Sequence, residues 1–176
     1  PLNDILLAMK VCFIGHRKID NVDELTAKLY DTVYELIANG ADTFLFGSKS
    51  EFNSACWNTV SALKQQYSFI ERVYVRAEYP VIDQSYTSYL LQYYEKTFYP
   101  PELIRAGKSV YVKRNRAMID ASDICIFYYN PEYTPPDKKR KKYSSLLPDI
   151  KHKSGTAIAF TYAQQTHKQI INLYKD

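Results

Sequence analysis

The chain has 176 residues, of which 46% are hydrophobic and 24% charged, with 17 tyrosines, 8 prolines and only 5 glycines. This length predicts one domain, and an aromatic content of 15% excludes a disordered chain. No run approaches the roughly 18 apolar residues of a membrane span, so no membrane partner is expected.

The net charge of +4 is concentrated in one stretch. Residues 137–153 hold seven Lys or Arg and two Asp, a net charge of +5, which leaves −1 for the rest of the chain. Nucleic-acid-binding faces usually spread basic residues over a whole surface. This distribution favours a basic loop over a nucleic-acid-binding domain.

The three cysteines lack C-x-x-C spacing, and each lies in an apolar stretch; they are Cys12, Cys56 and Cys125. We expect reduced, buried thiols in a cytoplasmic protein. No His, Cys or carboxylate spacing indicates a metal ion, and no motif indicates a bound cofactor.

The first third of the chain alternates short β-rich runs with helical patterns. The runs predict strands at residues 10–14, 43–46 and 71–77. The two helices between them begin with capping-box spacing, Asn21 with Glu24 and Ser48 with Glu51. This alternation is typical of a parallel sheet covered by helices.

The pattern breaks over residues 78–108, which we interpret as an insertion with a helix at residues 88–98. The regular pattern then resumes, and its predicted elements are a helix at 112–122, a strand at 123–129, a basic loop at 131–152, a helix from 155 to about 166 and a strand at 169–173. The run 123–129 is apolar at nearly every position, as expected of a strand buried between two helix layers.

Together these elements predict one Rossmann-like α/β domain over residues 9–176, a three-layer sandwich with a mainly parallel sheet of about five strands. Pro1–Ala8 precedes the first strand and is interpreted as an extension of the domain. The tyrosine-rich stretch 78–99 suggests a homo-oligomer as a hypothesis.

Polar and glycine residues follow several of the predicted strands. In open parallel sheets, ligands bind beyond the carboxyl ends of the strands, where glycine permits backbone approach and helix N-termini hold phosphate. The candidate ligand-binding residues are Gly15, His16, Arg17, Gly47, Ser48, Asn53, Arg114, Asn115, Asn130, Ser154, Gly155 and Thr156. They predict a phosphate-bearing, nucleotide-like ligand, although the G-x-G-x-x-G and P-loop motifs are absent.

Some of these residues have two readings. Arg114, Asn115 and Arg116 lie on a predicted helix, and Arg114 and Arg116 either face the ligand together with Asn115 or belong to a solvated helix face. Asp120 precedes a buried strand and is expected to be internal and paired. His16 is expected to be a hydrogen-bonding wall residue of the site, with proton transfer as the alternative.

Three motifs, in order, resemble the SLOG superfamily: Cys12-Phe13-Ile14-Gly15-His16-Arg17, the stretch Arg114-Asn115-Arg116-Ala117-Met118-Ile119-Asp120-Ala121-Ser122-Asp123, and Ser154-Gly155-Thr156. The chain is most similar to the small bacterial and phage branch with a C-F-x-G-H-R start. That resemblance implies a Rossmann-like fold and a nucleotide-derived ligand. Its relatives include phosphoribohydrolases, DNA-processing proteins that bind single strands, and sensors of ADP-ribose-like signals.

The chain departs from the phosphoribohydrolase pattern at two places. The catalytic Glu of their G-G-x-G-T-x-x-E signature would fall on Ala159, which has no acid–base group. Residues 47–53 stand in place of their Gly-rich G-G-x-x-G-F-D segment: Glu51 falls where the backbone of the relatives would approach a phosphate, and Asn53 replaces an acid.

Three functions follow from the sequence. The first is binding of a nucleotide or nucleotide-derived small molecule, as a sensor or sequestering module. The alternative is an N-glycosidic hydrolase acting on nucleotides, which needs an acid such as Glu51 or Asp120 beside the sugar. The second alternative is single-stranded nucleic-acid binding through Lys138–Lys142.

Overall fold

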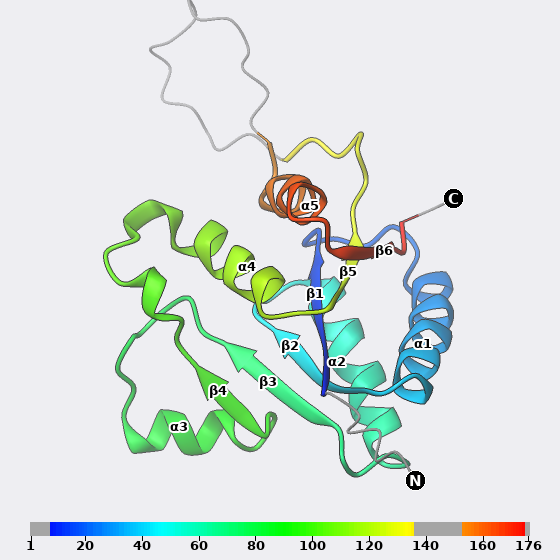
Figure 1. Ribbon diagram of the computed structural model, residues 1–176, viewed down its shortest axis with the longest axis horizontal. Coiled ribbons are helices and arrows are strands. Elements are labelled where there is room, and N and C mark those ends of the chain that lie inside the picture. Colours follow the sequence, from blue (N-terminus) through cyan, green and yellow to red (C-terminus); the bar gives the residue numbers. More distant parts are fainter. Residues whose placement is uncertain (1–7, 136–152, 175–176) are drawn as a thin grey trace, which may run out of the picture.

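A six-stranded, fully parallel sheet forms the centre of the protein (Figure 1). The computed structural model describes residues 8–135 and 153–174. The strands are β1 (Met9–Gly15), β2 (Ala41–Phe46), β3 (Glu71–Val75), β4 (Lys96–Phe98), β5 (Ile124–Tyr128) and β6 (Gln169–Asn172), in the order β4-β3-β2-β1-β5-β6. The predicted α/β class with a parallel sheet is confirmed, with six strands instead of about five.

Helices cover both faces of this sheet and complete the three layers (Figure 1). They are α1 (Val22–Ala38), α2 (Glu51–Lys64), α3 (Gln84–Leu90), α4 (Val110–Asp120) and α5 (Gly155–Gln165), with short 3-10 turns at Pro101–Leu103 and Gly107–Ser109. Helices α1 and α2 pack on one face, whereas α4 and α5 pack on the other.

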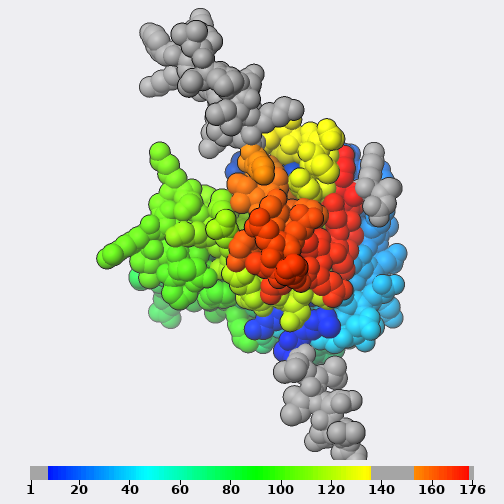
Figure 2. Space-filling model, turned by 45° about the horizontal axis from the view of Figure 1, so that its top comes forward, coloured from blue at the N-terminus to red at the C-terminus, as the bar shows by residue number. Residues whose placement is uncertain are grey.

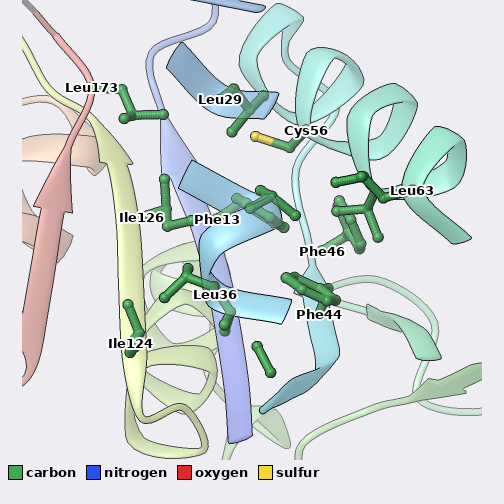
Figure 3. Close-up of a cluster of buried hydrophobic side chains, with 14 of the residues drawn as sticks. Phe13, Leu29, Leu36, Phe44, Phe46, Cys56, Leu63, Ile124, Ile126 and Leu173 are labelled. Carbon is green, nitrogen blue, oxygen red and sulfur yellow. The ribbon is translucent and has the colours of Figure 1, made fainter. Parts of the chain in front are cut away.

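Strand alternation sorts the core side chains between the two faces. In β1, Val11 and Phe13 point toward α1 and α2, whereas Cys12 and Ile14 point toward α4 and α5. Figure 3 shows Phe13, Phe44 and Phe46 meeting Cys56 and Leu63 of α2 in the larger cluster. All five residues of β5 are buried, as the apolar run predicted. The three cysteines are free and buried, as predicted.

The first two helices begin differently from each other. Asn21 caps α1 as predicted, because its Oδ1 accepts the Glu24 N–H at 3.2 Å while its Nδ2 donates to the Glu24 carboxylate. The prediction of Ser48 as the second cap was wrong, since Ser50 Oγ accepts the Asn53 N–H at 3.1 Å. The Glu51 carboxylate instead turns back to the loop after β1, where it accepts the Ile19 N–H and pairs with Lys18.

The predicted helix at 88–98 was also wrong. Helix α3 ends at Leu90, and residues 96–98 form β4, which pairs with β3 and extends the sheet. Long-range contacts override the local pattern here. The Glu95 carboxylate accepts from the Arg72 backbone N–H at 2.7 Å and from its guanidinium at 2.8 Å, which holds this segment against β3.

The segment that contains α3 and β4, green in Figure 2, stands to one side of the body. It exposes Tyr79, Tyr89 and Tyr93, which belong to a row of neighbouring aromatic rings. Self-association through residues 78–99 remains a prediction.

Two sequence predictions fall largely outside the described residues. Of the extension 1–8, only Ala8 is described, and of the basic loop 131–152, only residues 131–135 are described. Within residues 8–135 and 153–174, none of the helices combines the length and apolar character needed to cross a membrane.

Packing against α2 explains the glycine at the end of β1. A Cβ on Gly15 would lie 2.3 Å from Cδ1 and 3.0 Å from Cβ of Phe52, whose side chain is fully buried. We therefore expect Gly15→Ala to lower the free energy of unfolding by about 1–3 kcal/mol, because Phe52 has no room to retreat. Urea unfolding measures this change.

Gly155→Ala is the matched control, since no atom lies within 4 Å of the added Cβ. Its free energy of unfolding should stay within about 1 kcal/mol of wild type. Equal stability of Gly15→Ala and wild type would contradict the packing role of Gly15.

Candidate functional site

Most of the predicted ligand-binding residues lie in four segments, 15–17, 47–53, 130 and 154–156, and the first three of these are joined at the carboxyl edge of the sheet. The Glu51 N–H donates to the Arg17 carbonyl at 3.0 Å, which ties the loop after β2 to the loop after β1. The Asn130 N–H donates to His16 Nε2 at 2.9 Å, which ties in the loop after β5. The fourth segment, 154–156, begins α5, which packs against β1 and β5.

His16 closes the crevice between β1 and β5, where the direction of strand order reverses. Its side chain is 3% exposed, and its ring stacks on Tyr133 with a centroid separation of 4.0 Å. Because Nε2 accepts the Asn130 N–H, the ring is the neutral Nδ1–H tautomer. Desolvation by burial is the largest influence on the pKa of His16 and lowers it. His16 therefore holds the loop after β5, and Tyr133 covers it.

Asn53 occupies the backbone amides that a phosphate would otherwise bind after β2. The side chain is 4% exposed, and its Oδ1 accepts the N–H groups of Gly47 and Ser48, each at 3.3 Å. Its Nδ2 lies 3.5 Å from the Phe13 carbonyl. The amide therefore acts as an internal substitute for an anion, and it does not face a ligand.

Arg114 lies directly over Gly47. A Cβ on Gly47 would lie 2.8 Å from both Cδ and Nη1 of Arg114 and 2.6 Å from Sδ of Met118. Only a glycine therefore lets α4 approach the end of β2 this closely. This contact brings the guanidinium to the carboxyl edge of the sheet.

The charge of Arg114 is buried without a counterion among the described residues. The side chain is 4% exposed, and the one hydrogen bond it makes there runs from Nε to the neighbouring Asn115 Oδ1 at 3.0 Å. Desolvation lowers the pKa of Arg114 to about 10, although Tyr74, Tyr111 and Glu78 oppose this shift. Within residues 8–135 and 153–174, Nη1 and Nη2 have no acceptor, but neither is fully enclosed and unpaired; Arg76 Nε is the one side-chain atom there that is.

The remaining predicted residues are more open or serve local structure. Arg17 is exposed, and only its carbonyl has a described role, as the acceptor for Glu51. Ser154 caps α5, since its Oγ accepts the Ala157 N–H at 3.0 Å. Next to it Gly155 is exposed, with open space where a Cβ would stand, and Thr156 is buried.

Neither acid named for a hydrolase faces this edge freely. Glu51 pairs with Lys18 at 2.7 Å, and this hydrogen bond together with that from the Ile19 N–H lowers its pKa. Asp120 ends α4, which leads into the amino end of β5, and its carboxylate accepts from Tyr162 at 2.9 Å. Asp120 is therefore paired, as expected, but the prediction that it is internal was wrong, because it is exposed on α4; it lies toward the opposite edge of the sheet.

The structure adds residues that sequence reasoning missed. Tyr111 lies in the first turn of α4 and donates through its hydroxyl to Glu78, which follows β3. Tyr74 is close enough for both Arg114 and Lys49 to act on its pKa, although desolvation has the largest effect and raises it. The abundance of tyrosine was the one signal in the sequence, and it distinguishes neither Tyr74 nor Tyr111 from the other tyrosines and does not indicate Glu78.

Two open hollows of the described surface lie away from Arg114. One of about 370 Å³ lies between α1 and the end of β6, lined by residues that include Lys28, Glu35 and Asn172. The other, of about 460 Å³, lies on α3 beside Ser85 and Tyr89. The candidate site is therefore an edge with a buried cation beside it, not an enclosed cavity.

The neutral state of His16 predicts a pH dependence of stability. Since burial lowers its pKa in the folded protein, the unfolded state binds the proton more tightly. The stabilisation is complete above the unfolded-state pKa of about 6.5 and is lost as the pH falls below it. Between pH 7.5 and 5.5, we expect wild type to lose up to about 1 kcal/mol more free energy of unfolding than His16→Gln, which keeps an acceptor.

Urea unfolding of both proteins at the two pH values measures this difference. Equal losses in wild type and His16→Gln would show that His16 does not titrate with folding.

Among the described residues, no three His, Cys, Asp or Glu side chains are grouped to hold a metal ion. A scan against protein-family models finds no match, and no curated protein matches the chain. The geometry of the carboxyl edge, with Arg114 at its centre, is therefore the basis for assigning a function.

Proposed function

We propose that this protein binds a nucleotide or nucleotide-derived small molecule at the carboxyl edge of its sheet, with Arg114 as the main contact to phosphate. The binding would serve a sensor or sequestering role. One observation carries the proposal: Arg114, a residue that is 4% exposed, has no carboxylate partner among the described residues.

The energetic argument rests on the cost of burying a charge. Removing an ion from water costs several kcal/mol unless a partner of opposite charge compensates. A phosphate at Nη1 and Nη2 would supply two charge-assisted hydrogen bonds in the geometry that arginine favours. The stability that the free protein gives up would then return as binding energy.

Neighbouring groups at this edge support an anion. Lys49, two residues after Gly47, is exposed. The start of α5 adds the positive end of an 11-residue helix, with open space at Gly155.

Binding is favoured over N-glycosidic hydrolysis. Glu51 is held by the loop after β1, Asp120 lies toward the other edge, and Ala159 is buried with no acid–base group. The basic run Lys138–Lys142, which single-stranded nucleic-acid binding would use, lies outside the described residues.

Arg114→Met tests the proposal, with Arg116→Met as the matched control. Arg116 is exposed on the same helix, with its guanidinium 5.0 Å from the ring centroid of Tyr162. Calorimetric titration with AMP, ADP, ADP-ribose and NAD should show binding of at least one of them to wild type. Arg114→Met should weaken that binding by about 10–100-fold, the equivalent of about 1.5–3 kcal/mol, and Arg116→Met should not change it.

Absence of binding for all four compounds, or equal affinity of wild type and Arg114→Met, would contradict the proposal.

The same variant predicts an unusual effect on stability. Arg114→Met removes a buried charge that has no described counterion, so the free energy of unfolding of the unliganded protein should stay equal or rise. Urea unfolding without nucleotide measures it. A loss of about 3 kcal/mol or more would instead identify Arg114 as half of a buried pair within the protein.

A further inference from the structure

A carboxylate stands beside the buried cation without neutralising it. Glu78 follows β3 and is exposed, and its Oε1 accepts a hydrogen bond from the Tyr111 hydroxyl. Tyr111 lies in the first turn of α4, with Arg114 three residues later on the same helix. The centroid of its ring is 5.9 Å from Arg114 Cζ, so one tyrosine links the acid to the arginine.

The two charges interact at a distance but form no contact pair. The Coulomb interaction with Glu78 raises the pKa of Arg114, against the larger lowering by desolvation. No nitrogen–oxygen separation of 4 Å or less joins them, whereas five other acid–base pairs of the described residues meet that limit. Arg114 and Glu78 are therefore left to interact with a third group.

That third group has to satisfy opposite demands. An anion alone is attracted by Arg114 and repelled by Glu78. A carboxylate accepts hydrogen bonds, and its best neutral partners are hydroxyl groups. Among the described residues, Glu78 Oε2 has no donor, and Tyr111 keeps Oε1 in place.

We infer that Glu78 accepts hydrogen bonds from the ribose hydroxyls of a nucleotide whose phosphate contacts Arg114, so that the site selects ribonucleotides with a free 2′,3′-diol. The inference rests on the proposed function. An acidic residue beyond a strand of a parallel sheet is a general solution for binding a ribose hydroxyl. Tyr111 is then a positioning residue, and its half-exposed ring, at 51%, covers the side of the site next to Arg114.

Two nucleotides that differ only in the diol test this inference: AMP and 2′,3′-dideoxy-AMP. Calorimetric titration of wild type should give an affinity for AMP about 10-fold or more above that for the dideoxy compound, because hydrogen bonds to a charged acceptor are lost. Glu78→Gln should reduce this ratio to about 3-fold or less. It should leave the dideoxy compound bound at least as tightly as in wild type, because the repulsion of its phosphate is removed.

Two further variants separate position from charge. Tyr111→Phe keeps the ring but removes the hydroxyl that holds the Glu78 carboxylate in place. The ratio of the affinities for AMP and the dideoxy compound should therefore fall, while the affinity for the dideoxy compound stays unchanged. Glu71→Gln, at the amino end of the same strand, is the matched control and should keep the wild-type ratio.

Equal binding of both compounds to wild type would overturn the inference and leave the proposed function intact. An unchanged ratio of the two affinities in Glu78→Gln would also overturn it, since another residue would then bind the diol. Binding of neither compound to wild type would overturn the inference too. If ADP, ADP-ribose and NAD also fail to bind wild type, the proposed function is contradicted as well.

Discussion

The burial of the Arg114 guanidinium against the backbone of Gly47 is the constraint on which the candidate site depends. It requires glycine at the end of β2, because a Cβ there would lie 2.8 Å from the arginine. It also brings a positive charge out of water beside Ser48 and Lys49, with no carboxylate partner among the described residues. A fold that needed this charge only for packing would be more stable with an apolar side chain in its place. On the proposed function, a bound phosphate would compensate this charge.

The rest of the carboxyl edge is arranged differently from an open phosphate loop. Asn53 fills the amides of Gly47 and Ser48, and His16 fastens the loop after β5 under Tyr133. Parallel sheets most often bind ligands where the strand order reverses, which here is the crevice between β1 and β5. The His16 ring in that crevice is paired with Asn130 and covered by Tyr133 of the same chain. The available charge lies over the ends of β2 and β3, where α4 supplies Arg114 and Tyr111. The site is thus displaced from the expected crevice by one or two strands.

Much of the fold could be predicted from the sequence, because local patterns carry it. The buried run of β5, the alternation of β1 and the Asn21 cap each depend on near neighbours in the chain. Strand β4 could not be predicted, since residues 96–98 become a strand by pairing with β3, next to the contacts of Glu95 with Arg72. Ser50, and not Ser48, caps α2, and the Glu51 carboxylate accepts the Ile19 N–H of the loop after β1 in place of closing a capping box. The Arg114–Tyr111–Glu78 grouping joins α4 to the segment after β3, and tertiary placement alone reveals it.

Nuclear magnetic resonance of the arginine side chains tests the central claim most directly, since it observes the guanidinium itself. In protein labelled with ¹⁵N at arginine, the resonance missing from Arg114→Met identifies Arg114. Addition of AMP, ADP, ADP-ribose or NAD should shift that resonance and slow the rotation of its Nη groups, because phosphate oxygens would fix both of them. The Arg116 resonance should stay in place. An Arg114 resonance unmoved by saturating amounts of every one of these compounds would contradict the claim that its buried charge is an anion-binding group.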